Sequence, residues 1–250
     1  STTHQLICGA PNVRNAVNKV VAWVQPGSIL PDGTSIKVAE IRGVVSHGML
    51  ASEQELGLSD EHEGIIVLPE ETPIGVRLGD AIPIEDWIWE VDNKAITHRA
   101  DLWGHIGIAR EISMLTGRAL RVNPPEVEFG SDNPVELDTR LPEGCLRYLC
   151  TRIDGVTVEP SPIWLQRLLV ATGIRPISNV VDATNYVMLD TGNPLHAFDT
   201  KTLRQNAIRI TRTQGETSVT TLDEQERSVP QDTLLICDGA GPVAVAGVMG

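Results

Sequence analysis

Apolar residues in the first third of the chain come in short runs, and turn-forming residues separate one run from the next. The runs are Val20–Val24, Ile36–Ile41 and Gly64–Leu68. Pro-Gly and Asp-Gly pairs lie between them, and short strands at this spacing are typical of a small barrel or sandwich. We therefore predict β structure over residues 6–84, with one short helical turn at 52–57 that Gly57 ends.

Two later segments combine helical periodicity with start and stop signals. Apolar residues recur at helical spacing over residues 101–116, which predicts a helix capped by Asp101 and ended by Gly117. Residues 161–172 open with a Ser-Pro pair and are followed by glycine, which predicts a second helix. Strands are expected after it, at residues 207–213, 217–222, 233–237 and 242–248.

A connector rich in proline and acidic residues is the best domain boundary in the chain. We predict a multidomain, β-rich α+β protein rather than a single domain. The predicted parts are a β domain at 1–85, a linking α/β segment at 86–123, a linker at 124–141 and a mixed α/β domain at 142–250.

The formal net charge of −13 is unevenly distributed. Residues 50–93 hold twelve acidic residues and one basic residue, whereas residues 1–49 and 94–123 are weakly positive. The acidic stretch is either a solvated face or a contact with a basic surface elsewhere. Non-specific binding to a polyanion needs clustered lysine or arginine, so the chain can contact nucleic acid only through local patches or as part of a larger assembly.

Composition narrows the class of protein further. The sequence contains no run of 18 apolar residues, so we expect no membrane-spanning helix. Its four cysteines lack paired spacing, which favours reduced thiols and a cytoplasmic location over a zinc ribbon or a disulfide scaffold. The chain lacks an initial methionine and closes on an apolar stretch, which predicts a piece of a longer polypeptide.

Two short motifs admit several interpretations from the residues alone. Asn12 follows a strand-like run; it either satisfies its own backbone at a hairpin corner or, with Arg14, faces nucleic acid on a barrel rim. His196 and Asp199 could form a metal pair, a capped turn or part of a substrate pocket. A metal pair is the weakest of these, because a third and a fourth ligand are lacking nearby.

Collinear motifs along nearly the whole chain resemble one family, the beta subunits of bacterial phenylalanine–tRNA ligases. In the first part these are Cys8–Arg14, Arg42–Leu50, Glu55–Ser59, Ile96–Asp101 and Gly107–Glu111. In the second part they are Pro160–Pro162, Gly173–Ile177, Asn179–Leu189, Gly192–Asp199 and Val245–Gly250. His98 stands where the family commonly has asparagine, a minor departure.

The resemblance implies an OB-fold tRNA-binding barrel followed by an editing domain of the B3/B4 type. Asn12, Arg14, Lys37 and Arg42 are the candidate RNA contacts, with plain surface charge as the alternative for the three cations. The family enzyme uses ATP and Mg²⁺ and is a tetramer of two alpha and two beta subunits. The implied partners are therefore phenylalanine tRNA and the alpha subunit, and we expect no ATP or Mg²⁺ on this segment.

The editing domain of the family hydrolyses tyrosine wrongly attached to phenylalanine tRNA. By resemblance, Arg175 lies where the charged 3′ end enters, and Asn185 and His196 lie near the scissile ester. Gly247 and Gly250 correspond to glycines that leave room for the aminoacyl group. The plainer alternatives are an ion pair for Arg175, a turn for Asn185 and close packing for the two glycines.

Two other classes of function stay open at this stage. The chain could be a non-enzymatic RNA-binding module whose second domain is a scaffold, or a stand-alone ester hydrolase. We expect no aminoacylation by the chain alone and weak deaminoacylation, because the family's acidic residue for the tyrosine hydroxyl would follow Gly250. No Ser-His-Asp or Cys-His arrangement is evident in the sequence.

Overall fold

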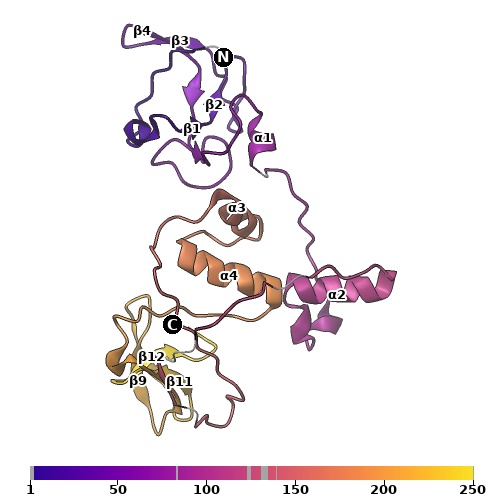
Figure 1. Ribbon diagram of the computed structural model, residues 1–250, viewed down its shortest axis with the longest axis vertical. Helices are drawn as coiled ribbons and strands as arrows, with labels where there is room; N and C mark the ends of the chain where they lie inside the picture. The colour runs from indigo at the N-terminus through magenta and orange to yellow at the C-terminus, as the bar shows by residue number, and fades with distance from the viewer. Residues whose placement is uncertain (1–2, 83, 123–124, 131–134, 139, 250) are drawn as a thin grey trace. The chain divides into compact units, whose positions relative to one another are not determined.

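The computed structural model describes residues 3–82, 84–122, 125–130, 135–138 and 140–249. The chain folds into two compact units, traced in Figure 1. The first unit comprises Ser1–Asp92 with Pro160–Ile177, and the second comprises Asn93–Glu159 with Ser178–Gly250. Residues 160–177 thus pack with the first unit although they lie inside the predicted domain 142–250. The domain boundaries at 85, 123 and 141 stay predictions.

The first unit is built from short antiparallel strand pairs. The strands are β1 (Val20–Val21), β2 (Trp23–Val24), β3 (Val38–Ile41), β4 (Val44–His47), β5 (Met49–Leu50) and β6 (Val67–Leu68). The pairs are β1 with β6, β2 with β5, and β3 with β4. The strands predicted at 20–24 and 36–41 are confirmed, whereas only the last two residues of the run at 64–68 are a strand. Closure of these pairs into an OB-fold barrel stays a prediction.

Two apolar clusters stabilise the first unit. One contains Ala22, Leu58, Ile66, Leu68 and Ile82, and the other contains Val24, Leu30, Ile36 and Ala51. Between them the predicted turn at 52–57 is confirmed. The Ser52 hydroxyl accepts from the Glu55 N–H, the Glu55 carboxylate accepts from the Ser52 N–H, and Gly57 has φ +66°. This reciprocal capping satisfies backbone groups that a single turn leaves unpaired.

Three short helices complete the first unit: the 3₁₀ turn η1 (Val13–Ala16), α1 (Leu78–Ala81) and α3 (Ile163–Ala171). Helix α3 was predicted at 161–172 with its proline in the first helical position, but Pro162 is the N-cap residue. Buried Leu165 and Leu169 form its inner face, and Ile163 packs against the cluster around Leu58. The Arg167 guanidinium donates to the Leu58 carbonyl, which ties the helix to the same unit.

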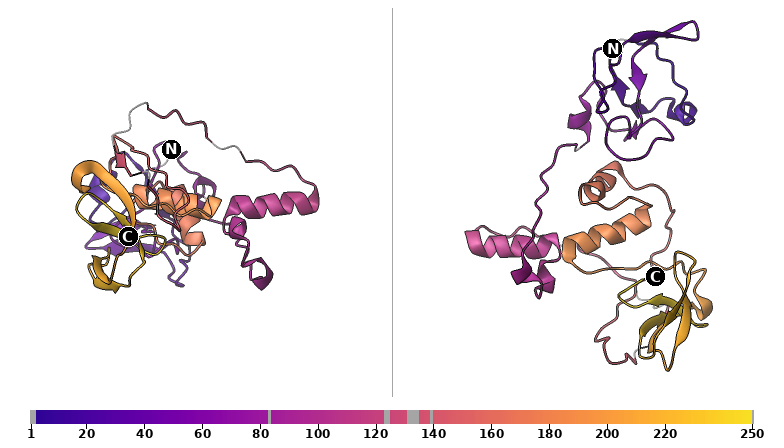
Figure 2. Two further views of the ribbon diagram at one scale, coloured as in Figure 1. Left: turned by 90° about the horizontal axis from the view of Figure 1, so that it is seen from below. Right: turned by 180° about the vertical axis from the view of Figure 1, so that it is seen from behind.

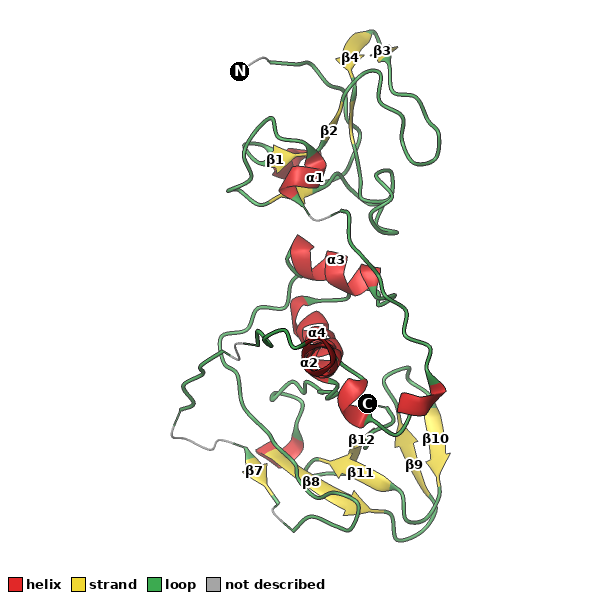
Figure 3. Cartoon of the chain, turned by 90° about the vertical axis from the view of Figure 1, so that its right-hand side faces the viewer, coloured by secondary structure: helices red, strands yellow, loops and turns green. Residues whose placement is uncertain are grey.

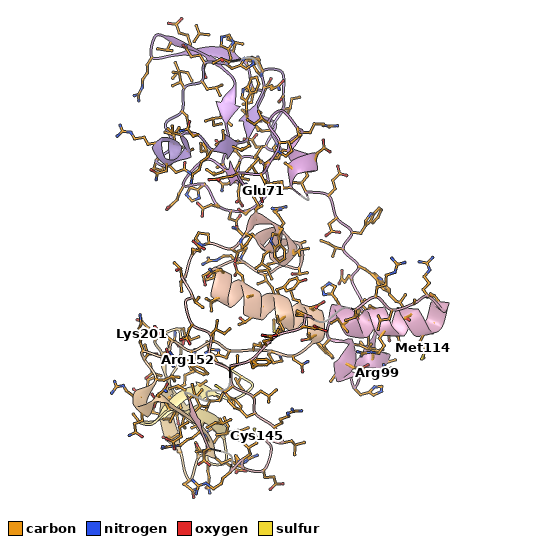
Figure 4. All side chains as sticks on the ribbon, viewed as in Figure 1. Glu71, Arg99, Met114, Cys145, Arg152 and Lys201 are labelled. Carbon is orange, nitrogen blue, oxygen red and sulfur yellow. The ribbon has the colours of Figure 1, made fainter. Side chains whose placement is uncertain are left out.

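Helix α2 (His105–Thr116) in the second unit starts later than the sequence predicts. Residues 100–102 form a separate 3₁₀ turn, η3, and the N-cap of α2 is Gly104 instead of Asp101. The reason is an ion pair, because the Arg99 guanidinium holds the Asp101 carboxylate at 2.8 Å and that of Glu111 at 3.1 Å. The predicted end is confirmed at Gly117, with φ +68°. Figure 4 labels Arg99 beneath this helix.

The sequence did not predict helix α4 (Asn179–Thr191). The Ser178 hydroxyl accepts from the Val181 N–H at its start, and Gly192 with φ +78° ends it. Its end lies beside the start of α2 in both views of Figure 2. A Cβ on Gly104 would come within 2.4 Å of the Gly192 nitrogen, so the backbones at the two helix ends approach closely. His105 Nδ1 also lies 2.9 Å from the Leu189 carbonyl oxygen.

A small sheet forms the rest of the second unit (Figure 3). Its strands are β7 (Glu136–Leu137), β8 (Ala207–Arg212), β11 (Leu234–Cys237) and β12 (Pro242–Val245), in the order β12-β11-β8-β7. Strands β9 (Thr217–Thr220) and β10 (Glu226–Val229) form a separate antiparallel pair. The four strands predicted after residue 207 are confirmed, although β10 was not expected. The remaining 3₁₀ turns are η2 (Lys94–Ile96) and η4 (Arg204–Asn206).

Asn179 fixes the point where the chain leaves and re-enters the second unit. Its backbone N–H donates to the Glu159 carbonyl, its Oδ1 accepts from the Glu159 N–H, and its Nδ2 donates to the Thr157 carbonyl. These hydrogen bonds hold Asn179, just after segment 160–177, against Glu159 and Thr157, which precede that segment; all three residues belong to the second unit. Among the helices that the structure describes, none has the length and apolar character needed to cross a membrane.

Candidate functional site

The residues predicted to form an editing pocket do not all belong to one unit. Asn185, His196 and Gly247 lie in the second unit, whereas Arg175 lies in the first. Gly250 lies outside the described residues. Arg175 is exposed and forms no ion pair with any residue that the structure describes, so its plainer alternative finds no support.

Asn185 lies within helix α4, so its alternative role in a turn is wrong. Its side chain is half-buried, one helical turn after Asp182, whose side chain is fully buried. The helix is held at both ends by its serine cap and by Gly192. Asn185 is therefore on a rigid element, as a residue that orients a substrate requires.

His196 follows helix α4 on an irregular segment, where its ring packs against an aromatic neighbour. The centroids of the His196 and Phe198 rings are 4.5 Å apart, with their planes at 59°. Phe198 in turn packs against the apolar cluster that includes Ile208 and Ile210 of strand β8. Desolvation lowers the pKa of His196 below its usual 6.5, so the imidazole is neutral at pH 7 and can accept a proton or a hydrogen bond.

Asp199 caps a turn, whereas the role of His196 stays a prediction. Its carboxylate accepts from the Lys201 N–H at 2.9 Å, and its carbonyl accepts from the Thr202 N–H at 2.9 Å. In the part of the chain that the structure describes, no three His, Cys, Asp or Glu side chains gather as a metal site. The contacts therefore favour a turn that fixes the segment after His196 over a metal pair.

Gly247 lies in a tight turn after strand β12. The Val245 carbonyl accepts from the N–H groups of Val248 and Met249, and Gly247 has φ +72°. No atom lies within 4 Å of the position that its Cβ would occupy, so close packing does not explain this glycine. The positive φ explains it, because glycine adopts this backbone conformation without strain. The space that a side chain would occupy at this position is free. No hydrogen bond or ring contact among the described residues links it to Asn185 or His196.

Asn12, a candidate RNA contact, has a structural role that neither sequence interpretation predicted. Its Oδ1 accepts from the Ile65 N–H, and its Nδ2 donates to the Ile65 carbonyl, both at 2.9 Å. A Cβ on Gly64 would lie 2.5 Å from the Asn12 side chain, so the amide fits against bare backbone. It therefore satisfies the backbone of a distant segment instead of its own, and its contact with RNA stays a prediction.

The three candidate cations of the first unit are exposed. Arg42 and Gly43, with φ +51° and +81°, form the two-residue turn between β3 and β4. Lys37 directly precedes this hairpin, and Arg14 lies on η1. None of the three forms an ion pair among the residues described. Their charges are therefore available to a polyanion.

A cavity of about 780 Å³ lies elsewhere in the first unit, between the Asn12 segment and the start of α3. Its wall includes Glu53, Glu61 and Glu63, which disfavour an anionic ligand. The lining of this cavity comes from separate segments of the chain, so no local sequence pattern predicts it. The exposed β3–β4 hairpin lies at the opposite end of the unit from Glu71, as Figures 1 and 4 show.

Comparison with known proteins divides the chain into two consecutive domains, the second of which includes residues 160–177 that pack with the first unit. Residues 1–77 match the family model described as "Putative tRNA binding domain", and residues 144–250 match the B3/4 domain. Curated relatives named phenylalanine–tRNA ligase beta subunit occur in Desulfotalea psychrophila at 47% identity over 99% of the chain and in Geobacter sulfurreducens at 43% over 98%. A further one, from Salinibacter ruber, is 41% identical over 98% of the chain.

The chain spans 30–31% of the length of these relatives. The resemblance found in the sequence motifs is thereby confirmed, and the structure has the mixed α/β character that was predicted. Over nearly its whole length, the chain is homologous to phenylalanine–tRNA ligase beta subunits and carries a tRNA-binding domain followed by a B3/4 domain.

Proposed function

We propose that this chain is the tRNA-binding and editing segment of a phenylalanine–tRNA ligase beta subunit. The observation that carries the proposal is the order of the two matched domains within a chain that is 40–47% identical to such subunits. In the holoenzyme, ATP and Mg²⁺ act at the alpha subunit, in a cytoplasmic tetramer of two alpha and two beta subunits. In this proposal the segment binds tRNA, and it binds neither ATP nor Mg²⁺.

In this proposal the first unit is an OB-fold barrel that contacts phenylalanine tRNA. Its support comes from the matched tRNA-binding model and from the exposed cations Arg14, Lys37 and Arg42, which form no ion pair among the described residues. A chain with net charge −13 repels RNA except where such cations are exposed. Binding should accordingly be weak, local and strongly dependent on salt.

Replacing Lys37 and Arg42 together by glutamine should weaken tRNA binding by about tenfold at low salt. Each phosphate contact that is lost should also reduce the slope of log K against log[salt] by roughly 1. Titration of labelled tRNA with the 250-residue chain at several salt concentrations measures both quantities. The matched control is Arg140→Gln, because Arg140 is an exposed arginine of the second unit that is already paired with Asp138.

An unchanged salt slope in the double variant would remove these two residues from the RNA interface. Equal losses in the Arg140→Gln control would indicate an effect of net charge alone. Both outcomes differ from failure to bind tRNA at all, which would contradict the role of the whole first unit.

The second unit is proposed to hydrolyse tyrosine from mischarged tRNA. A synthetic pocket shaped for phenylalanine discriminates poorly against an analogue that merely adds a hydroxyl, so a second site that recognises this group is needed. The ester is already activated, and positioning a water and stabilising the oxyanion suffice without a covalent nucleophile. A neutral His196 can orient that water, while Asn185 on α4 binds the aminoacyl end and Gly247 leaves it room. Arg175 and Gly250 stay candidate pocket residues on the resemblance alone.

Replacing His196 by alanine should slow deacylation of tyrosyl-tRNA by about 100-fold or more, because a positioned acid–base side chain typically contributes about 10²- to 10⁴-fold. The assay uses the full-length beta subunit assembled with its alpha partner and follows release of labelled tyrosine. Since the pKa of His196 is lowered by desolvation, the wild-type rate should fall to half of its pH 8 value only at a pH below 6.5. Aminoacylation with phenylalanine should be unaffected.

His98→Ala is the control, because His98 is exposed and lies on a different segment of the same unit. Unchanged deacylation in His196→Ala would support the second candidate function, an RNA-binding module with a scaffold domain. That candidate is kept because no contact among the described residues joins Asn185, His196 and Gly247.

A further inference from the structure

The imidazole of His196 lies against an aromatic ring that belongs to the core of the second unit. The centroids of the His196 and Phe198 rings are 4.5 Å apart, and the ring planes are tilted by 59°. Aromatic pairs favour tilted arrangements at centroid distances of about 4.5–7 Å, because the positive edge of one ring faces the electron-rich face of the other. The contact therefore favours one orientation of the imidazole over its other rotamers.

Phe198 is itself fixed by the packing of its side chain. The half-buried ring packs against the apolar cluster of Val135, Leu203, Ile208 and Ile210. Strand β8 provides the two isoleucines, so the ring lies against a regular element of the sheet. Side chains in close-packed cores occupy few rotamers. A ring restricted in this way also restricts the side chain that lies against it.

A turn fixes the backbone that follows Phe198. The Asp199 carbonyl accepts from the N–H groups of Thr202 and Leu203, at 2.9 and 3.3 Å. Leu203 is buried in the same apolar cluster against which Phe198 packs. Both ends of the turn are therefore attached to one cluster. His196 lies only two residues before this attachment, so its backbone has little freedom to move away from Phe198.

The ring of Phe198 also determines the surroundings of the imidazole. Phenylalanine has neither a charge nor a conventional hydrogen-bonding group, so it covers His196 without binding its nitrogens. Desolvation is the cause that lowers the pKa of His196. An apolar ring that excludes water from one side of the imidazole has this effect, because burial disfavours the charged form.

We propose that Phe198 is a positioning residue of the editing site, whose ring holds the His196 imidazole in the orientation that directs a water at the ester. Phe198 contacts neither the substrate nor the reacting atoms, and it acts only through His196. The inference rests on the proposed function, because it specifies how the imidazole of that site is held. Catalytic groups work only when the side chains around them lock their geometry.

The main test compares Phe198→Leu with Ile208→Val in the full-length beta subunit assembled with its alpha partner. Leucine keeps an apolar side chain on the cluster but removes the ring, whereas Ile208→Val shortens a side chain of the same cluster and leaves both rings in place. Phe198→Leu should lower kcat for release of tyrosine from tyrosyl-tRNA by about tenfold, because a misplaced catalytic group loses much of its effect. The KM should stay within about twofold, since only the orientation of His196 changes.

Ile208→Val is the matched control for core packing. It should change kcat by less than about twofold, because the loss of one buried methyl group lowers stability only slightly. Aminoacylation with phenylalanine should be the same in both variants and in the wild type.

A second measurement does not depend on catalysis. NMR titration of the 250-residue chain follows the ring protons of His196, which are assigned by comparison with His196→Gln. The ring-current contribution of Phe198 to their chemical shifts should vanish in Phe198→Leu. In Phe198→Ala the pKa of His196 should rise towards its usual 6.5, because water then reaches the imidazole.

Three results would overturn the proposal. The first is normal deacylation in Phe198→Leu when His196→Ala is slow. The second is an equal loss of kcat in Phe198→Leu and Ile208→Val, because Phe198 would then serve only the core. The third is a His196 whose ring-proton shifts and pKa are the same in all Phe198 variants. Wild-type deacylation in His196→Ala is a separate outcome: it contradicts the proposed function, and this proposal with it, whatever Phe198→Leu does.

Discussion

Replacing Gly107 by alanine is expected to destabilise the second unit by about 3–5 kcal/mol, enough to unfold its helical part. A Cβ at this position would lie 1.5 Å from the Asp101 carbonyl oxygen and 2.6 Å from its carbon. Both are backbone atoms of η3, so no change of rotamer can relieve the overlap. At an open helical site the same substitution would stabilise the helix by about 1 kcal/mol, because alanine has the higher helix propensity.

Loss of hydrogen-exchange protection in α2, with a lower urea midpoint, would show this effect. Gly130→Ala is the control, since nothing lies within 4 Å of its Cβ position and its φ is not positive. Its stability should stay within about 0.5 kcal/mol of the wild type. A Gly107→Ala variant as stable as this control would mean that η3 does not pack against α2 as the structure shows.

Replacing Gly48 by alanine is expected to destabilise the first unit by about 3–4 kcal/mol, through two effects that add. Gly48 has φ +110°, a conformation that residues with a side chain rarely adopt. A Cβ there would also come within 2.3 Å of the Val24 carbonyl oxygen and 2.7 Å of Trp23 Nε1. The indole, which donates to the His47 carbonyl at 3.0 Å, would have to move and lose this bond.

Gly43→Ala separates the two effects, because Gly43 also has a positive φ, +81°, but nothing lies within 4 Å of its Cβ position. This control should lose only about 1–2 kcal/mol, the cost of the left-handed conformation. Urea unfolding followed by amide exchange in β2 and β5 gives both values. Similar losses at the two glycines would contradict the close approach of the chain at Gly48.

Local signals in the sequence predicted most of the individual elements. Gly117 ended α2, and Gly57 and Ser52 delimited a single turn, because each of these residues acts on the nearest backbone groups. Strand β8 follows from the alternation of apolar and polar residues at 207–213, and strand β11 from the continuous apolar run within 233–237. In such cases the information needed is contained in a few adjacent residues.

The elements that were missed depend on weaker or more distant signals. Helix α4 contains Asn179, Val180, Val181, Thr184 and Asn185, residues of low helix propensity, and only its Ser178 cap and Gly192 stop announce it. Asp101 was predicted as the cap because it directly precedes the periodic apolar residues. Its carboxylate instead binds Arg99, a side-chain contact that periodicity does not reveal. A search for capping pairs would have found α4.

For the candidate site, the sequence motifs predicted which residues take part but not how the chain positions them. The resemblance identified the motifs, but not that Asn12 would bond to Ile65, 53 residues further along the chain. It also did not show that Arg175 belongs to the first unit while His196 belongs to the second. Both facts depend on which distant segments pack together, and a single sequence contains no direct record of that.

The packing of residues 160–177 with the first unit has a consequence for how the protein folds during its synthesis. Part of the packing around Leu58 comes from α3, so the first ninety or so residues cannot complete their core when they leave the ribosome. At translation rates of about 5–20 residues per second, α3 follows roughly 4–16 s later. During that interval the nascent chain exposes apolar surface around Leu58 that a chaperone can bind. Helix α3 covers this surface once it has been synthesised.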